Sequence, residues 1–254
     1  MKLGFIGTGI ISSALVTGFC ESGRDVSVLV SPRTKERAEA LRDRYPDQVR
    51  IALENQQIVD ESEWIFLAVL PQQAMKVLEE LHFGPEKKLI SLVPSLDMEE
   101  ASKLTGPLAV FADVVPLPFA AKRIGPVVLY PPVPEVKELL SILGTVVEAE
   151  TREQMSILRT STALMSPYYM LLSKVVSWCE SKGLKEEKAR TYLTSYWGAL
   201  SQMAAEFPGP LDELAREATP GGLNWQALND LEEKGALDEW QKVLDPVLER
   251  VRKK

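Results

Sequence analysis

The chain opens with a short apolar segment, a glycine turn and a second apolar segment with helical spacing. Residues 3–6 are suited to a buried parallel strand, and residues 12–19 predict a helix. Gly7 and Gly9 allow a tight turn between them, so unpaired N–H groups and the positive end of the helix dipole face a phosphate group. This order constrains the fold most, because it predicts the first βα unit of an open, dinucleotide-holding sheet.

The glycine fingerprint is incomplete, which leaves two other interpretations open. Ser12 takes the third glycine position, where a small residue still allows close packing of helix on strand. A secretory signal peptide is one alternative for residues 3–20, but the glycines, the hydroxyl side chains and the lack of a clear cleavage site argue against it. The other alternative is a βα turn that binds nothing.

Composition favours a two-domain enzyme of the cytoplasm. The 254 residues are 45% hydrophobic, and a net charge of -7 offers no basic surface for nucleic acid or an anionic membrane. Cys20 and Cys179 lack metal-type spacing and are expected to be reduced thiols. His82 is the single histidine and is expected in a loop, so neither a Ser/His/Asp triad nor a histidine zinc site is predicted. No metal is expected.

Strands and helices alternate in the first half of the chain and give way to helices alone. Strands are expected at residues 3–6, 26–30, 49–51, 64–69, 89–92, 108–113, 127–130 and 145–148, with helices at 12–21, 34–44, 55–59, 72–80, 98–104 and 136–143. Helices alone follow at 152–164, 167–182, 185–206 and 211–218, with one or two more within 225–251. The pattern predicts a Rossmann-type, doubly wound, mostly parallel sheet in a dinucleotide-binding domain (1–151), followed by an all-helical domain (152–254) for dimerisation and substrate binding.

The end of the second predicted strand indicates the cofactor. NAD-binding folds of this type place an acid there for the ribose 2′-hydroxyl, whereas a 2′-phosphate requires cations and small polar groups. This chain has Ser31, Arg33, Thr34 and Lys35 and no acid at the strand end. NADP(H) is therefore expected, with Arg33 as a bidentate donor. Alternatively, Arg33 is only solvated at a helix start that Ser31 or Thr34 caps.

Several short strings in fixed order then carry a family resemblance. They are the Gly7–Gly9 turn, Ser31 and Arg33, Asn55, residues 67–72 (LAVLPQ), 91–94 (SLVP), 143–147 (LGTVV) and 220–222 (PGG). In this order, the chain resembles pyrroline-5-carboxylate reductase over nearly its whole length. The resemblance implies an NAD(P)H-binding Rossmann domain, a helical domain that forms an interlocked homodimer, and a shared cleft for a cyclic imine.

The resemblance also implies site residues. The cofactor residues are Gly7, Thr8, Gly9, Ile10 and Ile11 at the pyrophosphate; Ser31 and Arg33 at the 2′-phosphate; Asn55 at the adenosine; Ala68, Val69, Pro71 and Gln72 beneath the nicotinamide ribose; and Val93 and Pro94 near the nicotinamide. The substrate residues are Ser166, Tyr168, Tyr169, Thr219, Gly221, Gly222 and Asn224. Independently, the Pro220-Gly-Gly turn exposes N–H groups that suit a substrate carboxylate, although a plain helix connection fits it equally well.

The departures from the family concern the substrate pocket. Leu70 replaces a strand-end lysine, and Leu117 stands where the family's Met-Pro-Asn-x-Pro string has asparagine. Residues 164–169 (LMSPYY) replace Gly-Ser-Gly-Pro-Ala-Tyr, so Leu164 stands in place of a glycine, and Leu223-Asn224 replaces a threonine pair. These changes predict a more apolar pocket with added phenols.

Hydride transfer to an iminium carbon depends mainly on positioning, so no catalytic side chain is assigned. Reduction of pyrroline-5-carboxylate to proline is the favoured activity. Reduction of a different imine is one alternative, and a non-catalytic NADPH sensor is the other.

Overall fold

The computed structural model describes residues 1–94, 96 and 98–253 and divides into two compact units. Unit 1 comprises Met1–Arg159 and the end of the chain from Val251, and unit 2 comprises Thr160–Arg250. The predicted boundary at 151/152 falls at the start of a helix that this division assigns mostly to unit 1.

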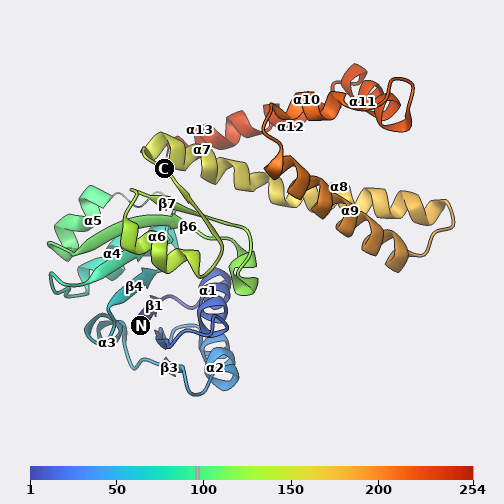
Figure 1. Cartoon of the computed structure of the whole chain (residues 1–254). Helices are drawn as coiled ribbons and strands as arrows, with labels where there is room; N and C mark the ends of the chain where they lie inside the picture. The colour runs from blue at the N-terminus through green and yellow to red at the C-terminus, as the bar shows by residue number, and fades with distance from the viewer. Residues whose placement is uncertain (95, 97, 254) are drawn as a thin grey trace. The chain divides into compact units, whose positions relative to one another are not determined.

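Unit 1 is built on an eight-stranded sheet with the order β3-β2-β1-β4-β5-β6-β7-β8 (Figure 1). The strands are β1 (Lys2–Ile6), β2 (Ser27–Val30), β3 (Val49–Ile51), β4 (Trp64–Leu67), β5 (Lys88–Ser91), β6 (Val110–Val115), β7 (Pro126–Tyr130) and β8 (Thr145–Glu148). All neighbours pair in parallel except β6 and β7. The doubly wound, mostly parallel sheet predicted from the sequence is thus confirmed.

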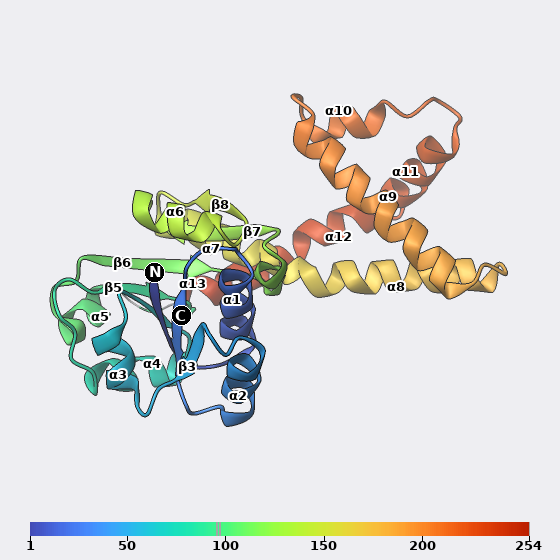
Figure 2. The same cartoon turned by 60° about the horizontal axis from the view of Figure 1, so that its bottom comes forward.

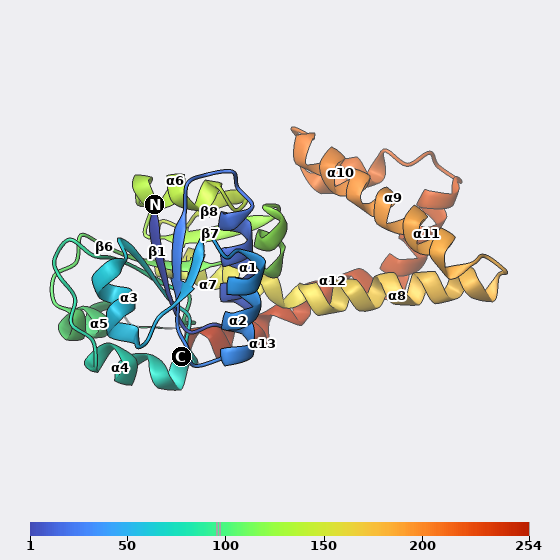
Figure 3. The same cartoon turned by 90° about the horizontal axis from the view of Figure 1, so that it is seen from below.

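Helices cover both faces of this sheet. The helices are α1 (Ile10–Cys20), α2 (Lys35–Arg44), α3 (Asn55–Glu61), α4 (Pro71–Glu79), α5 (Met98–Thr105) and α6 (Pro134–Ser141). Figure 3 shows α1 and α2 on one side of the strands and α3, α4 and α5 on the other. Each side has its own core, with Leu15 and Leu139 in one and Ile58 and Leu78 in the other. Alternating large side chains on the strands explain this, because successive residues point to opposite faces.

The 3₁₀ helix η1 (Pro118–Lys122) was not predicted, and it packs closely on α1. A Cβ on Gly18 of α1 would lie 2.3 Å from the carbonyl oxygen of Ala120. The two helices can approach this closely only because residue 18 is glycine.

Helix α7 (Arg152–Ser161) follows β8 and packs on the sheet through Met155, beside Val128 and Tyr130. Near its end, Arg159 Nη2 donates to both carboxylate oxygens of Asp113 on β6, at 3.0 and 2.9 Å. This ion pair lies within unit 1 and fastens α7 to the sheet.

Unit 2 consists of helices (Figure 2). They are η2 (Thr162–Leu164), α8 (Met165–Ser181), α9 (Glu186–Glu206), α10 (Leu211–Arg216), α11 (Leu223–Glu233), α12 (Ala236–Lys242) and α13 (Leu244–Arg252), which ends in unit 1. The chain turns between α8 and α9 at Gly183, whose φ is +90°. Three helices occupy the region where one or two were expected, and Gly235 at φ +64° separates the first two of them.

Unit 2 has a small core. In its described residues, the buried hydrophobic cluster consists of Val176, Ala189 and Leu193. No helix in the described part of the chain combines the length and apolar character that a membrane span requires.

Candidate functional site

The glycine turn after β1 is tight at one residue and open at the next. Gly7 has φ +98°, and a Cβ there would lie 2.5 Å from the carbonyl oxygen of Ala68. Gly9 is the N-cap of α1, and no heavy atom lies within 4 Å of where its Cβ would stand. Gly7 is therefore required by the protein itself, whereas the open space above Gly9 has room for a ligand.

Polar side chains of the turn bind main-chain atoms. Thr8 Oγ1 donates to the carbonyl oxygen of Ser31 at 2.8 Å, and Ser12 Oγ donates to that of Gly7 at 2.7 Å. Thr8 and Ser12 are both buried. Ser12 thus fits the third fingerprint position because its small side chain fastens the turn. The buried Thr8 side chain is directed away from a ligand, so any contact of Thr8 with a cofactor falls to its main chain.

The N-terminus of α1 suits a pyrophosphate. The first turn carries no acidic residue, and it begins with the exposed Ile10. Four N–H groups at a helix start have no partner within the helix, and the dipole there favours an anion. The open position at Gly9 and this helix start together fit the phosphates of a dinucleotide.

Two polar residues that follow β2 differ in burial. Ser31 is buried, and its N–H donates to the carbonyl oxygen of Phe5 at 2.9 Å. Arg33 is exposed, and its Nη1 donates to Gln73 Oε1 on α4 at 2.8 Å. Thr34 is the N-cap of α2 but makes no capping hydrogen bond with its side chain. The Arg33 side chain therefore reaches α4 instead of capping the helix beside it.

A pocket of about 410 Å³ brings three predicted cofactor residues together. Its lining contains Ser31, Arg33 and Asn55, with Pro32, Glu54, Gln56, Val77, Glu80 and Leu81. Asn55 is the first residue of α3. Sequence reasoning missed the two carboxylates, Glu54 and Glu80, because it examined only the end of the second strand for acids.

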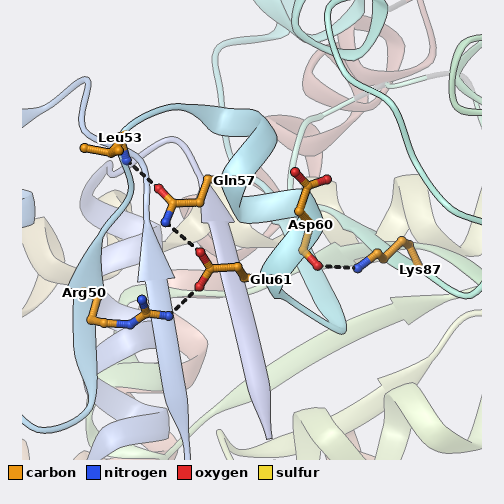
Figure 4. A network of polar contacts seen from close by, with 6 residues as sticks. All are labelled: Arg50, Leu53, Gln57, Asp60, Glu61 and Lys87. Carbon is orange, nitrogen blue, oxygen red and sulfur yellow. Dashed lines mark hydrogen bonds and ion pairs between the residues drawn. The ribbon is translucent and has the colours of Figure 1, made fainter.

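A polar network holds the loop before Asn55 against α3 (Figure 4). The N–H of Leu53 donates to Gln57 Oε1 at 2.8 Å, and Gln57 Nε2 donates to Glu61 Oε1 at 2.7 Å. Arg50 on β3 pairs with Glu61 Oε2 at 2.7 Å. The hydrogen bond from Gln57 and, to a smaller extent, the hydrogen bond from Arg50 lower the pKa of Glu61. This network fixes the entry into α3, and hence the position of Asn55 in the pocket.

The opposite wall of the pocket is fastened through the loop after α4. Gln56 Oε1 accepts the main-chain N–H of His82 at 2.9 Å, and Gln56 Nε2 donates to the His82 carbonyl oxygen at 3.0 Å. The structure places His82 in this loop, where its main chain is used. In Figure 4, Lys87 Nζ also donates to the carbonyl oxygen of Asp60, at 2.9 Å.

The other predicted cofactor residues follow β4 and β5 at the same edge of the sheet. Ala68 lies against Gly7, with Val69 next to it; Pro71 begins α4, and Gln72 is exposed on its first turn. Val93 is buried, and its N–H donates to Ser91 Oγ at 3.2 Å, while Pro94 is exposed. Since β1, β2, β4 and β5 are parallel, these residues and the pyrophosphate turn share the carboxyl edge, where open sheets bind ligands.

A second cavity of about 420 Å³ lies in unit 1 beside the Asp113–Arg159 ion pair. Burial raises the pKa of Asp113, and the charge and hydrogen bond of Arg159 oppose that effect. Sequence analysis did not single out this pair. An acid inside the otherwise apolar strand β6 was the available signal, because buried acids are normally paired.

The predicted substrate residues form two separate groups in unit 2. Ser166, Tyr168 and Tyr169 lie exposed on the first turn of α8, and the Tyr168 ring centroid is 5.7 Å from that of Trp197. Thr219, Gly221, Gly222 and Asn224 lie at the start of α11, where Gly221 has φ +77° and the Gly222 N–H donates to the Thr219 carbonyl oxygen at 2.9 Å. Within the described residues, no hydrogen bond, ion pair or ring contact joins the two groups.

Metal ligation finds no support in the described residues, which contain no cluster of three or more His, Cys, Asp or Glu side chains suited to a metal ion.

Comparison with known proteins finds similarity to one family model and to two curated proteins. A family model described as NADP oxidoreductase, coenzyme F420-dependent, matches residues 2–95. Pyrroline-5-carboxylate reductase of Corynebacterium melassecola is 26% identical over 246 residues, which cover 91% of this chain and 90% of the relative. The relative of the same name in Methanosarcina acetivorans is 26% identical over 253 residues, covering 92% and 90%.

One solved structure shows the same fold along the whole chain. The 1-pyrroline-5-carboxylate reductase of Streptococcus pyogenes superposes with a TM-score of 0.84 at 18% identity, covering 100% of this chain and 99% of that chain. Both units are thus represented in the shared fold. The two curated relatives have the same name, and the alignments cover nine tenths of the length of each. The chain is thus similar in sequence to two pyrroline-5-carboxylate reductases and shares the fold of a third.

Proposed function

We propose that this protein is an NADPH-dependent reductase of a cyclic imine, with pyrroline-5-carboxylate, reduced to proline, as its substrate. The observation that carries the proposal is the carboxyl edge of the sheet, where an open glycine turn lies beside a pocket that contains Arg33. The similarity to two curated relatives supports the reaction type, since both are named for this reductase.

The reaction needs little acid–base chemistry from the chain. A dihydronicotinamide, when bound, would supply a hydride to the carbon of the protonated C=N bond, which would become a C–N single bond. The protein has to hold the two reactants at contact distance and exclude water. The exposed loop position of the single histidine is consistent with this, and no catalytic side chain is proposed.

NADP(H) is the proposed cofactor because of the residues at the end of β2. Arg33 offers a guanidinium to a 2′-phosphate, and Ser31 lines the same pocket. The pyrophosphate would lie at Gly7 to Ile11, and Ala68, Val69, Pro71, Gln72, Val93 and Pro94 would line the path to the nicotinamide.

Unit 2 is proposed to supply the substrate residues of a homodimer. Within the described residues of one chain, no hydrogen bond, ion pair or ring contact joins the Ser166, Tyr168 and Tyr169 group to the Pro220-Gly-Gly turn. Most of the exposed large hydrophobic side chains of the protein are in this unit. A second copy would cover such side chains, and it can bring the start of one α8 to the other chain's α11.

A different cyclic imine is the second candidate substrate. Leu70 is 63% exposed at the N-cap of α4 and Leu223 is 86% exposed at the start of α11, where the family pattern has polar side chains. Apolar groups at these places favour a bulkier, less polar imine. A non-catalytic NADPH sensor is the remaining alternative.

Turnover experiments separate these candidates. Purified protein, NADPH and either pyrroline-5-carboxylate or bulkier cyclic imines are followed at the nicotinamide absorbance. Consumption with pyrroline-5-carboxylate supports the first candidate, and consumption with a bulkier imine alone supports the second. NADPH binding without any consumption supports the sensor and contradicts both enzymatic candidates.

A cytoplasmic location belongs to the same proposal. Burial raises the pKa of Cys20 to about 11, so this thiol is inert, and Cys179 is far from it in sequence. Two reduced, unpaired thiols are typical of cytoplasmic proteins.

A further inference from the structure

The Arg33 side chain is held from a distant part of the chain. Arg33 follows β2, and its Nη1 donates at 2.8 Å to Oε1 of Gln73, which lies forty residues further along, on the first turn of the pocket-lining helix α4. Within the described residues, Arg33 forms no ion pair. A side chain with several rotatable bonds is thus restrained by one neutral partner.

Helix α4 presents Gln73 on its pocket-lining face. Val77 and Glu80 line the pocket of about 410 Å³ with Arg33, and Gln73 lies four residues before Val77. Residues spaced by four and by seven lie on one face of a helix. Gln73 therefore stands one turn before the pocket wall, and Arg33 spans the distance between the end of β2 and this helix.

The neutrality of Gln73 matters because the pocket also contains two acids. Glu54 and Glu80 line it together with Arg33. A guanidinium left to rotate would be attracted to these carboxylates, and pairing would cancel the charge that a phosphate requires. An amide oxygen accepts one N–H and leaves the positive charge and the other four N–H donors of Arg33 available.

We propose that Gln73 is a positioning residue that holds Arg33 toward the 2′-phosphate and thereby sets the preference for NADP(H) over NAD(H). This inference rests on the proposed cofactor site but adds a residue that the glycine and strand-end motifs do not contain. Gln73 acts through Arg33 and contacts no reacting atom.

Adenosine fragments isolate this pocket from the rest of the site. Adenosine 2′,5′-bisphosphate carries the 2′-phosphate, and AMP lacks it, while neither contains a nicotinamide. Calorimetric titration of the full-length protein with each fragment gives a preference ratio that does not depend on turnover. The same titrations with NADPH and NADH extend the ratio to the whole cofactors.

Three substitutions at residue 73 distinguish the positioning of the Arg33 side chain from the neutralisation of its charge. Gln73→Met keeps the length of the side chain without the acceptor, and Gln73→Ala removes both. Each is expected to weaken binding of the bisphosphate about fivefold and to leave AMP unchanged, because a hydrogen bond that orders Arg33 is lost. Gln73→Glu keeps an acceptor but neutralises Arg33, so it is expected to reduce the preference further than Gln73→Ala. Glu79→Ala, exposed on the same helix, is the control and is expected to change neither affinity.

Each outcome has a distinct meaning. Unchanged preference in Gln73→Met and Gln73→Ala overturns the role of Gln73, as does an equal weakening of both fragments. A wild-type protein that binds the bisphosphate no better than AMP overturns both this inference and the NADP(H) site. If the fragment results are as expected but no imine is reduced, the role of Gln73 stands and the proposed catalytic activity fails.

Discussion

Unit 1 buries large side chains on both faces of its sheet, whereas unit 2 buries three hydrophobic residues in its described part. Phe5 stacks on Phe66 with ring centroids 4.6 Å apart inside unit 1, while Trp178 and Tyr192 of unit 2 are more than half exposed. Apolar burial is the main source of stability, so unit 1 contains what it needs to stay folded. Unit 2 as a single copy does not, and its stability should depend on association.

The largest effect is expected in the core of unit 1. Phe66→Ala should lower the free energy of unfolding by about 3–5 kcal/mol, because it leaves a cavity between Phe5 and Phe19. Urea denaturation followed by circular dichroism measures the change. Phe66→Leu fills part of the cavity and should cost less. Equal costs for the two variants would show that this core is not tightly packed.

The ion pair that fastens α7 to the sheet should give the next largest effect. Arg159→Met leaves the buried Asp113 carboxylate without its partner and should cost about 3–5 kcal/mol in urea denaturation. The double variant Asp113→Leu/Arg159→Met should recover most of this loss, because both charges are removed. A double variant as unstable as Arg159→Met would show that the pair itself stabilises unit 1.

Unit 2 should respond to protein concentration, unlike the core of unit 1. The urea midpoint of unfolding is expected to rise with concentration, and Trp178→Ala should weaken association by about 2 kcal/mol, because a large aromatic side chain typically anchors such an interface. Sedimentation equilibrium measures the association free energy. Glu180 is exposed on the same helix, and Glu180→Ala is the control. A 28.2 kDa monomer at every concentration would contradict the proposed dimer and the proposed substrate site that depends on it.

Substitutions of the two glycines of the turn should affect different properties, stability at Gly7 and NADPH binding at Gly9. Gly7→Ala should cost about 1–3 kcal/mol, since φ +98° and the nearby Ala68 carbonyl both oppose a Cβ. Gly9→Ala should change stability by less than about 0.5 kcal/mol but weaken NADPH binding, because its Cβ would enter the open space. Thermal unfolding and NADPH titration test the pair. Unimpaired NADPH binding in Gly9→Ala would place the pyrophosphate elsewhere.

The smallest expected effect is a pH dependence within unit 1. Burial raises the pKa of Asp113 above its ordinary value of 3.8, so the folded state holds this proton more tightly than the unfolded state. The contribution of Asp113 is then most favourable below pH 3.8 and is lost as pH rises through the folded pKa. As pH rises from 3.8 through the folded-state pKa of Asp113, the free energy of unfolding of the wild type should fall relative to that of the Asp113→Leu/Arg159→Met variant. The opposite sign would mean that Arg159 outweighs burial.

The sequence predicted the local elements of both units better than their long-range contacts. Strands β3 and β8 have the predicted bounds. The antiparallel pairing of β6 with β7 is not encoded in either strand alone. The same holds for Arg33 and Gln73, and for Asp113 and Arg159, which lie forty and forty-six residues apart. Such contacts depend on the folded sheet, so composition and spacing could not place them.

The last residues of the chain return to unit 1. Unit 2 begins at Thr160, and the chain belongs to unit 1 again from Val251, where Arg252 pairs with Glu153. Unit 2 is thus an insertion with two covalent connections to its host. A protease that cuts one connection leaves the other intact, so a single nick should not release unit 2, and a chain shortened before Val251 would convert the insertion into a tail.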